Sequence, residues 1–167
     1  MYHPDVDVFE VFDRDGSFLA LLYCDFYPRE GKKSGACMTT FKGQYIDKEG
    51  VNHRPHVSLV MNFTKPTDTK PALLTLGEVE TFLHEFGHSL HEMFSNCQYE
   101  ELHGTNVYWD FVESPSQFME NFAIEKEFLS TFAVHYQTSE PLPDELIQRI
   151  IDSRNFCVAM GCLRQEI

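Results

Sequence analysis

The sequence predicts an α+β fold, in which a small, mostly antiparallel sheet precedes several helices. Up to residue 70, short runs of alternating or of β-branched and aromatic residues are separated by turn-forming segments, which is the pattern of strands. From residue 71 onward, apolar residues recur at steps of three and four, which is the spacing of amphipathic helices. Strands first and helices after are typical of α+β proteins. We therefore expect one domain over 1–167, with a sheet-rich part at 1–70 and a helical part at 71–167.

Four strands are expected in the first part. The run DVFEVFD (7–13) alternates, RDG forms a turn, and FLALLYCDFY (18–27) returns as the second strand of a hairpin. The segments ACMTTF (36–41) and HVSLVMNFT (56–64) are the third and fourth strands, and a long connection joins them. The segment KPTDTKP then ends regular structure with two prolines.

Three helices are expected in the second part. The first covers 76–95, where the apolar residues form one stripe, and Asn96 is expected to end it. The second begins between Asp110 and Ser116 and continues to about Val134. The third is DELIQRIIDSRNFCVAM (144–160), after the break QTSEPLPDE, with Asp144 as its N-cap.

Composition and charge limit the classes of function. With 43% hydrophobic and 14% aromatic residues among 167, the chain is globular. Its formal net charge of -13 argues against nucleic acid and anionic membrane as partners. The sequence shows no signal peptide and no membrane helix of roughly 18 apolar residues. Five scattered cysteines without a CxxC pair are typical of reduced thiols, so we expect a cytoplasmic protein.

The first expected helix carries the residues with most chemistry, His84-Glu85-Phe86-Gly87-His88. Residues four apart lie one above the other on a helix, so His84 and His88 can reach one ion. Glu85 is rotated by about 100° from His84, where it can take a proton from a metal-bound water. Imidazole and carboxylate ligands suit Zn²⁺. The same pattern also arises by chance on a solvated helix face, so further features are needed.

Three further features favour a zinc site. A catalytic zinc needs a third protein ligand, and Glu113 can supply it from a returning helix. Polar residues at Asp110, Glu113, Gln117 and Glu120 form one stripe, which could face the first helix. Ligating histidines usually donate their second N–H to a carboxylate. Glu80, one turn before His84, is placed for that role, and Asp110 or Glu120 could serve likewise.

Other residues near the motif can be interpreted either as structural residues or as functional ones. His91 follows His88 by three residues, and we interpret it as a structural histidine rather than a ligand. His103, Gly104 and Tyr108 lie in the loop after the first helix. Loop or packing residues are the default for these three, and contact with a substrate is the alternative.

Several motifs of the chain, taken together, resemble those of a known family. HEFGHSLHEMF followed by GTNVYWDFVESPSQFMENF resembles the thimet oligopeptidase family of zinc peptidases, which includes oligopeptidases and peptidyl-dipeptidases. The segments YCDFYPREGKK, NFTKP and EVETFL resemble it too, and the likeness extends from about Val6 to about Ile151. The resemblance implies that His84, His88 and Glu113 bind the zinc, that Glu85 is the general base, and that Glu80 supports the first histidine.

The same resemblance implies a partial, zincin-like catalytic core that hydrolyses peptide bonds in short oligopeptides. Family members are much longer chains, with a helical half before this region and oxyanion donors after it. We therefore expect 1–167 to be a fragment that is weakly active or inactive by itself. HVSLVMNFT is expected to present a sheet edge to an extended peptide. Whether the parent acts as an endopeptidase or releases dipeptides stays open.

The sequence leaves two alternative interpretations open. The first is a non-catalytic zinc-binding or peptide-binding module, in which His91 or His103 closes the zinc site as a fourth ligand. The second is that no metal binds, because the second helix does not dock in a truncated chain.

Overall fold

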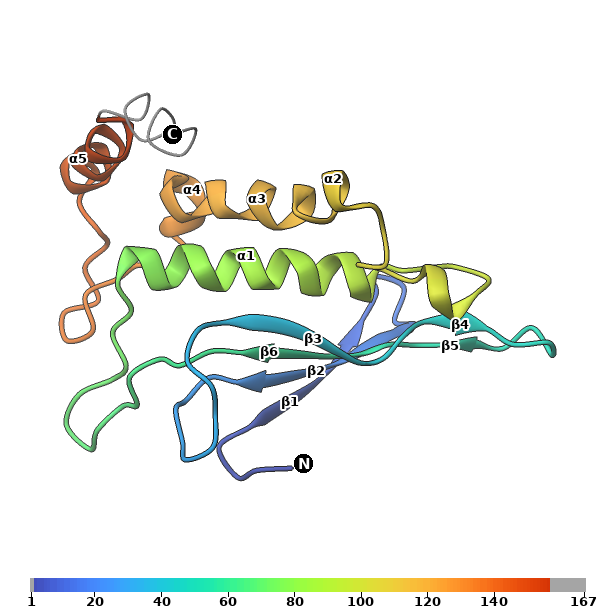
Figure 1. Ribbon diagram of the computed structural model, residues 1–167. Helices are drawn as coiled ribbons and strands as arrows, with labels where there is room; N and C mark the ends of the chain where they lie inside the picture. Colours follow the sequence, from blue (N-terminus) through green and yellow to red (C-terminus); the bar gives the residue numbers. More distant parts are fainter. Residues whose placement is uncertain (1, 157–167) are drawn as a thin grey trace, which may run out of the picture. The chain divides into compact units, whose positions relative to one another are not determined.

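The computed structural model of the chain describes residues 2–156 (Figure 1). Contacts within the chain divide it into two compact units, Met1–Glu120 and Asn121–Ile167. The sheet and helices α1 to α3 belong to the first unit, and α4 and α5 belong to the second. Within 2–156, no helix combines the length and the apolar composition that crossing a membrane would require.

The main sheet has four strands in the order β1 (Asp7–Phe12), β2 (Phe18–Asp25), β6 (His56–Val60) and β3 (Cys37–Lys42). The β1–β2 hairpin and the β3–β6 pair are antiparallel, whereas β2 and β6 are parallel. The sheet is therefore mixed. The strand β6 lies between β2 and β3, so the expectation that HVSLVMNFT forms an edge is wrong. Its three central residues are buried, as a central strand requires.

The connection between the third and fourth strands is not wholly irregular. It contains a small hairpin of β4 (Tyr45–Ile46) and β5 (Asn52–His53). Gly50 has a φ of 82° in the turn of this hairpin, a conformation that favours glycine.

Helix α1 (Leu76–Met93) packs on one face of the sheet. It begins where predicted, because Thr75 and Glu78 form a reciprocal capping box. It ends two residues earlier than predicted. There the Arg54 guanidinium donates to the carbonyl oxygens of Met93 at 2.6 Å and Ser95 at 2.9 Å, which would otherwise lack partners.

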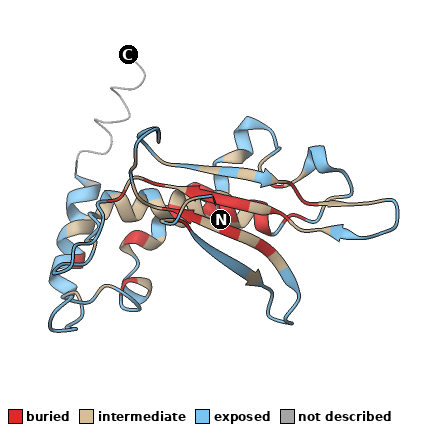
Figure 2. Ribbon diagram, turned by 90° about the horizontal axis from the view of Figure 1, so that it is seen from below, coloured by how far each residue is buried: buried red, intermediate tan, exposed pale blue. Residues whose placement is uncertain are grey.

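The hydrophobic core lies between α1 and the central strands. Buried residues concentrate there, as Figure 2 shows in red. Leu22, Val57, Leu59 and Met93 belong to this core, and Phe86 of α1 packs against it. The apolar side of α1 is thus used by the sheet, which leaves the opposite side to the polar residues of the motif.

The predicted second helix is broken into short pieces. In the first unit these are α2 (Trp109–Val112) and α3 (Ser114–Glu120), and in the second unit η2 (Asn121–Ile124) and α4 (Lys126–Leu129). The prediction of one helix to Val134 is therefore wrong. Pro115 lacks the N–H that would continue the bonding from α2 into α3, and Glu125 adopts an extended backbone before α4.

The predicted third helix is present as α5 (Asp144–Asn155). Its N-cap is Pro143, so Asp144 is the first helical residue and not the cap that the sequence suggested. Its carboxylate still lies in the first turn, where the helix dipole favours negative charge. The predicted continuation of this helix beyond 156 falls outside the described residues.

Candidate metal centre

Three of the predicted site residues come together in the first unit. His84 Nε2 lies 3.3 Å from Glu113 Oε2, and His88 Nε2 lies 3.1 Å from the same oxygen. The ligand atoms of His84, His88 and Glu113 all lie within 4.8 Å of one another. The two histidines are four residues apart on α1, and Glu113 joins α2 to α3 above them. The arrangement presents two imidazole nitrogens and one carboxylate oxygen to a single point.

A close approach of α3 to α1 brings Glu113 to the histidines. A Cβ on Gly87 would lie 2.6 Å from Ser116 Cα and 2.7 Å from the Pro115 carbonyl oxygen. No side chain fits at Gly87 without displacing α3, because those contacts are far shorter than ordinary van der Waals separations. Gly87, between the two histidines, is therefore the point at which α3 packs against α1.

Ser116 orients the Glu113 carboxylate. Its hydroxyl, which is fully buried, lies 2.8 Å from Glu113 Oε2 and 2.9 Å from the Glu113 carbonyl oxygen. The hydrogen bond from this hydroxyl lowers the pKa of Glu113, and the nearby imidazoles of His88 and His84 lower it further. Glu113 is therefore ionised at neutral pH, as a metal ligand must be.

Glu120, one of the carboxylates that the sequence offered to support His84, contacts its ring. Glu120 Oε1 lies 2.6 Å from His84 Nδ1. A carboxylate only accepts, so Nδ1 carries the proton and the lone pair of Nε2 is left facing Glu113. Glu80 lines a hollow of about 300 Å³ together with His84 and Glu120. Asp110 is exposed on α2, and no ion pair joins it to either histidine within 2–156.

Glu85, the predicted base, is held by the sheet. Its Oε2 accepts a hydrogen bond of 2.7 Å from the backbone N–H of Met38 in β3. β3 is the edge strand of the described sheet on this side, so the carboxylate lies between α1 and a strand edge. This contact joins residues far apart in sequence, and nothing in the local pattern indicated it.

The three candidate substrate contacts have different positions. Tyr108 is 87% exposed. Gly104 is buried, and His103 is nearly so, because both pack against the carboxylate of Glu92 at the end of α1. Glu92 was not among the predicted site residues. A glutamate one turn after His88 reads as part of a solvated helix face, and only its burial distinguishes it.

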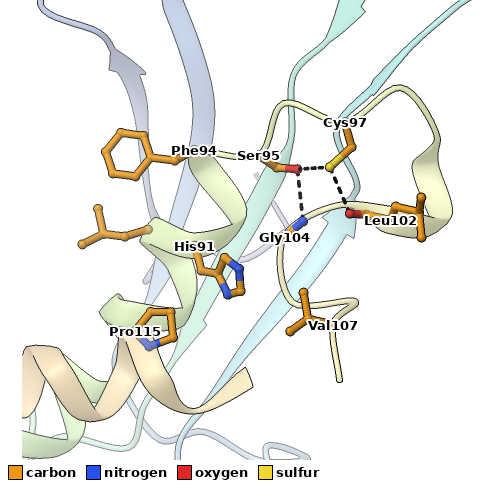
Figure 3. A pocket seen from close by; sticks show the side chains of 9 residues that line it. His91, Phe94, Ser95, Cys97, Leu102, Gly104, Val107 and Pro115 are labelled. Atoms are coloured by element: carbon orange, nitrogen blue, oxygen red, sulfur yellow. Dashed lines mark hydrogen bonds between the residues drawn. The ribbon is translucent and has the colours of Figure 1, made fainter. Parts of the chain in front are cut away.

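His91 lies outside the group of three. Its ring contacts Phe111 edge to face, with centroids 5.9 Å apart, and burial lowers its pKa. It lines an apolar hollow of about 460 Å³ together with Phe94, Leu102, Val107 and Pro115 (Figure 3). This position agrees with a structural histidine.

None of the cysteines in the described part of the chain belongs to the group of three. The three cysteines that the structure describes, Cys24, Cys37 and Cys97, form no disulfide with one another. Cys24 is buried in the sheet, and burial raises the pKa of its thiol to about 12.

Comparison with known proteins assigns the chain to one family, and the three relatives described below are all named as peptidases. The profile of peptidase family M3 matches residues 1–167. Oligopeptidase A of Escherichia coli (strain K12) is 42% identical over 166 residues, which cover 99% of this chain and 24% of that protein. Dipeptidyl carboxypeptidase of the same organism is 42% identical over 157 residues, with coverage of 93% and 22%. Mitochondrial intermediate peptidase of Homo sapiens is 34% identical over 159 residues, with coverage of 95% and 22%.

The chain spans about a quarter of the length of these relatives.

Proposed function

Because the chain belongs to peptidase family M3, we propose that it forms the zinc-binding part of a peptidase that hydrolyses peptide bonds in short oligopeptides. The observation that carries the proposal is the convergence of His84, His88 and Glu113 on one point. Relatives named oligopeptidase A and dipeptidyl carboxypeptidase share the same 42% identity, so the proposal is limited to peptide-bond hydrolysis. The sheet and the helices that hold the site are, in this proposal, part of a zincin-like core.

The donor set fits zinc. Ligand atoms bound to one zinc at about 2.0–2.2 Å in a tetrahedron lie about 3.3–3.6 Å from one another. The separations of 3.3 Å and 3.1 Å between the histidine nitrogens and Glu113 Oε2 are close to that range. Two neutral imidazoles and one carboxylate are a ligand set typical of zinc hydrolases.

The number of ligands supports an enzyme over a structural zinc module. A structural zinc is usually closed by four protein ligands, whereas a catalytic zinc keeps one position open. Among the described residues the group contains three. His103, one candidate for a fourth, instead contacts Glu92.

Each residue then has a chemical role. Zn²⁺, when bound, would lower the pKa of a water ligand and polarise the scissile carbonyl. Glu120 holds the proton on His84 Nδ1 and so keeps Nε2 available. Glu85 uses Oε2 to bind the Met38 N–H, which leaves Oε1 to accept the proton of the attacking water and pass it to the leaving amine.

The open edge of β3 offers a place where a peptide substrate could bind. A peptide that added to this edge as a further strand would pass beside the Glu85 carboxylate, because β3 is the strand to which Glu85 is bonded. This role was predicted for HVSLVMNFT, but β6 is a central strand, so the proposal places the peptide at β3.

The test is hydrolysis of a fluorogenic peptide by the full-length polypeptide that contains this region. Glu85→Gln is expected to retain zinc and to lose several orders of magnitude in kcat, because an amide cannot accept the water proton. Glu101→Gln, at an exposed position in the loop, is the control and is expected to keep wild-type activity. Equal rates for Glu85→Gln and wild type, or no activity in zinc-loaded wild type, would refute the proposal.

A further inference from the structure

The carboxylate of Glu92 is buried, and no lysine or arginine among residues 2–156 pairs with it. Glu92 lies four residues after His88 on α1, and it has 0% exposure. Among the described residues the imidazole of His103 faces this carboxylate, with Nδ1 2.6 Å from Glu92 Oε1, and the two form an ion pair when the imidazole is protonated. A carboxylate in such a position is expensive to desolvate unless it is paired. The contact with His103 and the hydrogen bond from the Thr105 N–H are the interactions that offset the desolvation of Glu92.

The backbone around this pair leaves no room for other side chains. A Cβ on Gly104 would lie 2.0 Å from Glu92 Oε2, and a Cβ on Gly43 would lie 2.3 Å from the His103 ring. The Thr105 N–H donates to Glu92 Oε2 at 3.3 Å, and Asn106 Nδ2 lies 3.2 Å from His103 Nε2. Three separate segments of the chain thus close around the contact between Glu92 and His103.

The pair also holds the loop that leads to Glu113. The connecting loop (94–108) runs from the end of α1 to the start of α2. Beyond Thr105 the loop has little support, since Tyr108 and Trp109 are 87% and 90% exposed. On the other side of Thr105, the Gly104 N–H donates to the Ser95 hydroxyl at 3.1 Å (Figure 3). Glu92 is therefore the buried polar attachment of this loop to α1, and the contact of Phe111 with His91 is the next one before Glu113.

We propose that Glu92 and His103 form a clasp that fixes the connecting loop against α1 and thereby positions Glu113 opposite His84 and His88. Both are positioning residues and neither touches the reacting atoms. The consequence for the metal rests on the proposed function, whereas the fixing of the loop does not.

Two substitutions at His103 separate the clasp from simple packing. In His103→Asn the side-chain amide can place a donor where Nδ1 lies, whereas His103→Leu fills similar space without one. His103→Leu is expected to speed amide exchange at least tenfold within 97–113 of the metal-free chain, and to leave the sheet unchanged. His103→Asn is expected to stay within about threefold of wild type, as rescue by a conservative change requires.

The metal site supplies the second readout. His103→Leu is expected to weaken zinc affinity about tenfold in competition with a chelator, in line with other residues that orient ligands. It is also expected to change the visible absorption bands of the cobalt-loaded chain, because those bands report the ligand geometry. Val57→Ala, in the core of the sheet, is the control. It should lower overall stability and leave the cobalt bands unchanged.

Each outcome decides the proposal. It is overturned if His103→Leu speeds exchange uniformly through residues 2–120, or if that variant keeps wild-type zinc affinity. Should His103→Leu fail to fold, Glu92→Gln/His103→Leu replaces it, since that pair leaves no unpaired buried charge. If the wild-type chain binds no zinc, the proposed function fails. The clasp is then tested only by the amide exchange rates of the His103 variants.

Discussion

Ser116 shows how one hydroxyl prepares a ligand. It is buried three residues after Glu113 and bonds to the Glu113 carboxylate. Ser116→Ala removes the main cause of the lowered pKa of Glu113, so that pKa should rise toward its ordinary value. Zinc affinity should fall about tenfold, because the carboxylate loses its orienting donor.

Carboxyl titration by NMR in the metal-free chain and zinc competition with a chelator measure these two effects. Ser114→Ala, at an exposed position at the start of α3, is the matched control. An unchanged pKa of Glu113 in Ser116→Ala would contradict this account of the ligand.

Asp25 at the end of β2 is the residue from which we expect acid sensitivity. Burial alone would raise its pKa, but hydrogen bonds from Arg29, Lys32 and Tyr2 outweigh burial and hold the pKa well below its usual range. A depressed pKa stabilises the fold above the unfolded value of about 3.9. That stabilisation is lost as the pH falls from there through the folded pKa.

Asp25→Asn should therefore be less stable at pH 7, by about 3 kcal/mol, because it leaves buried cations without a counter-charge. Its stability should change less than that of wild type as the pH falls below about 4. Urea unfolding at a series of pH values measures both effects. Parallel curves for the two proteins would show that Asp25 is not the responsible group.

At the scale of elements, the docking of α3 on α1 depends on Gly87. Gly87→Ala should destabilise the chain by about 1–3 kcal/mol through overpacking, and should weaken zinc binding by displacing α3. Gly77→Ala on the same helix meets nothing within 4 Å. It should instead stabilise the chain by about 0.5–1 kcal/mol, because alanine suits a helix better than glycine.

Thermal unfolding and chelator competition on both variants give the comparison. If the two glycine variants behave alike, the close approach at Gly87 does not set the position of α3.

The elements that sequence reasoning predicted are those with local signals. Helix α1 begins at Leu76 as expected because its apolar spacing and cap lie within a few residues. The position of β6 between β2 and β3 was missed, since alternation within a strand carries no information about its neighbours. Pro115 is a signal in the sequence for the break between α2 and α3, because proline lacks the N–H that a continuous helix needs.

In the candidate site, too, residues with a local sequence signal were predicted and contacts between separate elements were not. His84 and His88 follow from helical spacing alone, and Glu113 followed from the need for a third ligand on a returning element. The Glu85–Met38 bond and the Glu92–His103 contact join residues from separate elements. Such pairs depend on how the elements pack, which a single sequence does not reveal.

At the scale of the whole molecule, the chain is a quarter of the length of its relatives yet folds the three proposed ligands together. It also exposes large aromatic side chains near them, including Tyr108, Trp109 and Phe118. Exposed aromatic surface of this kind marks contacts with other protein. Metal binding therefore tests this chain more directly than turnover does.

The most direct test of the account is X-ray absorption at the zinc edge on the chain loaded with one equivalent of zinc, compared with His84→Ala and Glu113→Gln. We predict one zinc per chain with two imidazole nitrogens and one carboxylate oxygen at about 2.0–2.2 Å, completed by a water ligand. The substitutions should remove one imidazole and weaken the carboxylate contribution, respectively. A wild-type spectrum with sulfur ligands, with four protein ligands, or unchanged in either variant would contradict the assignment.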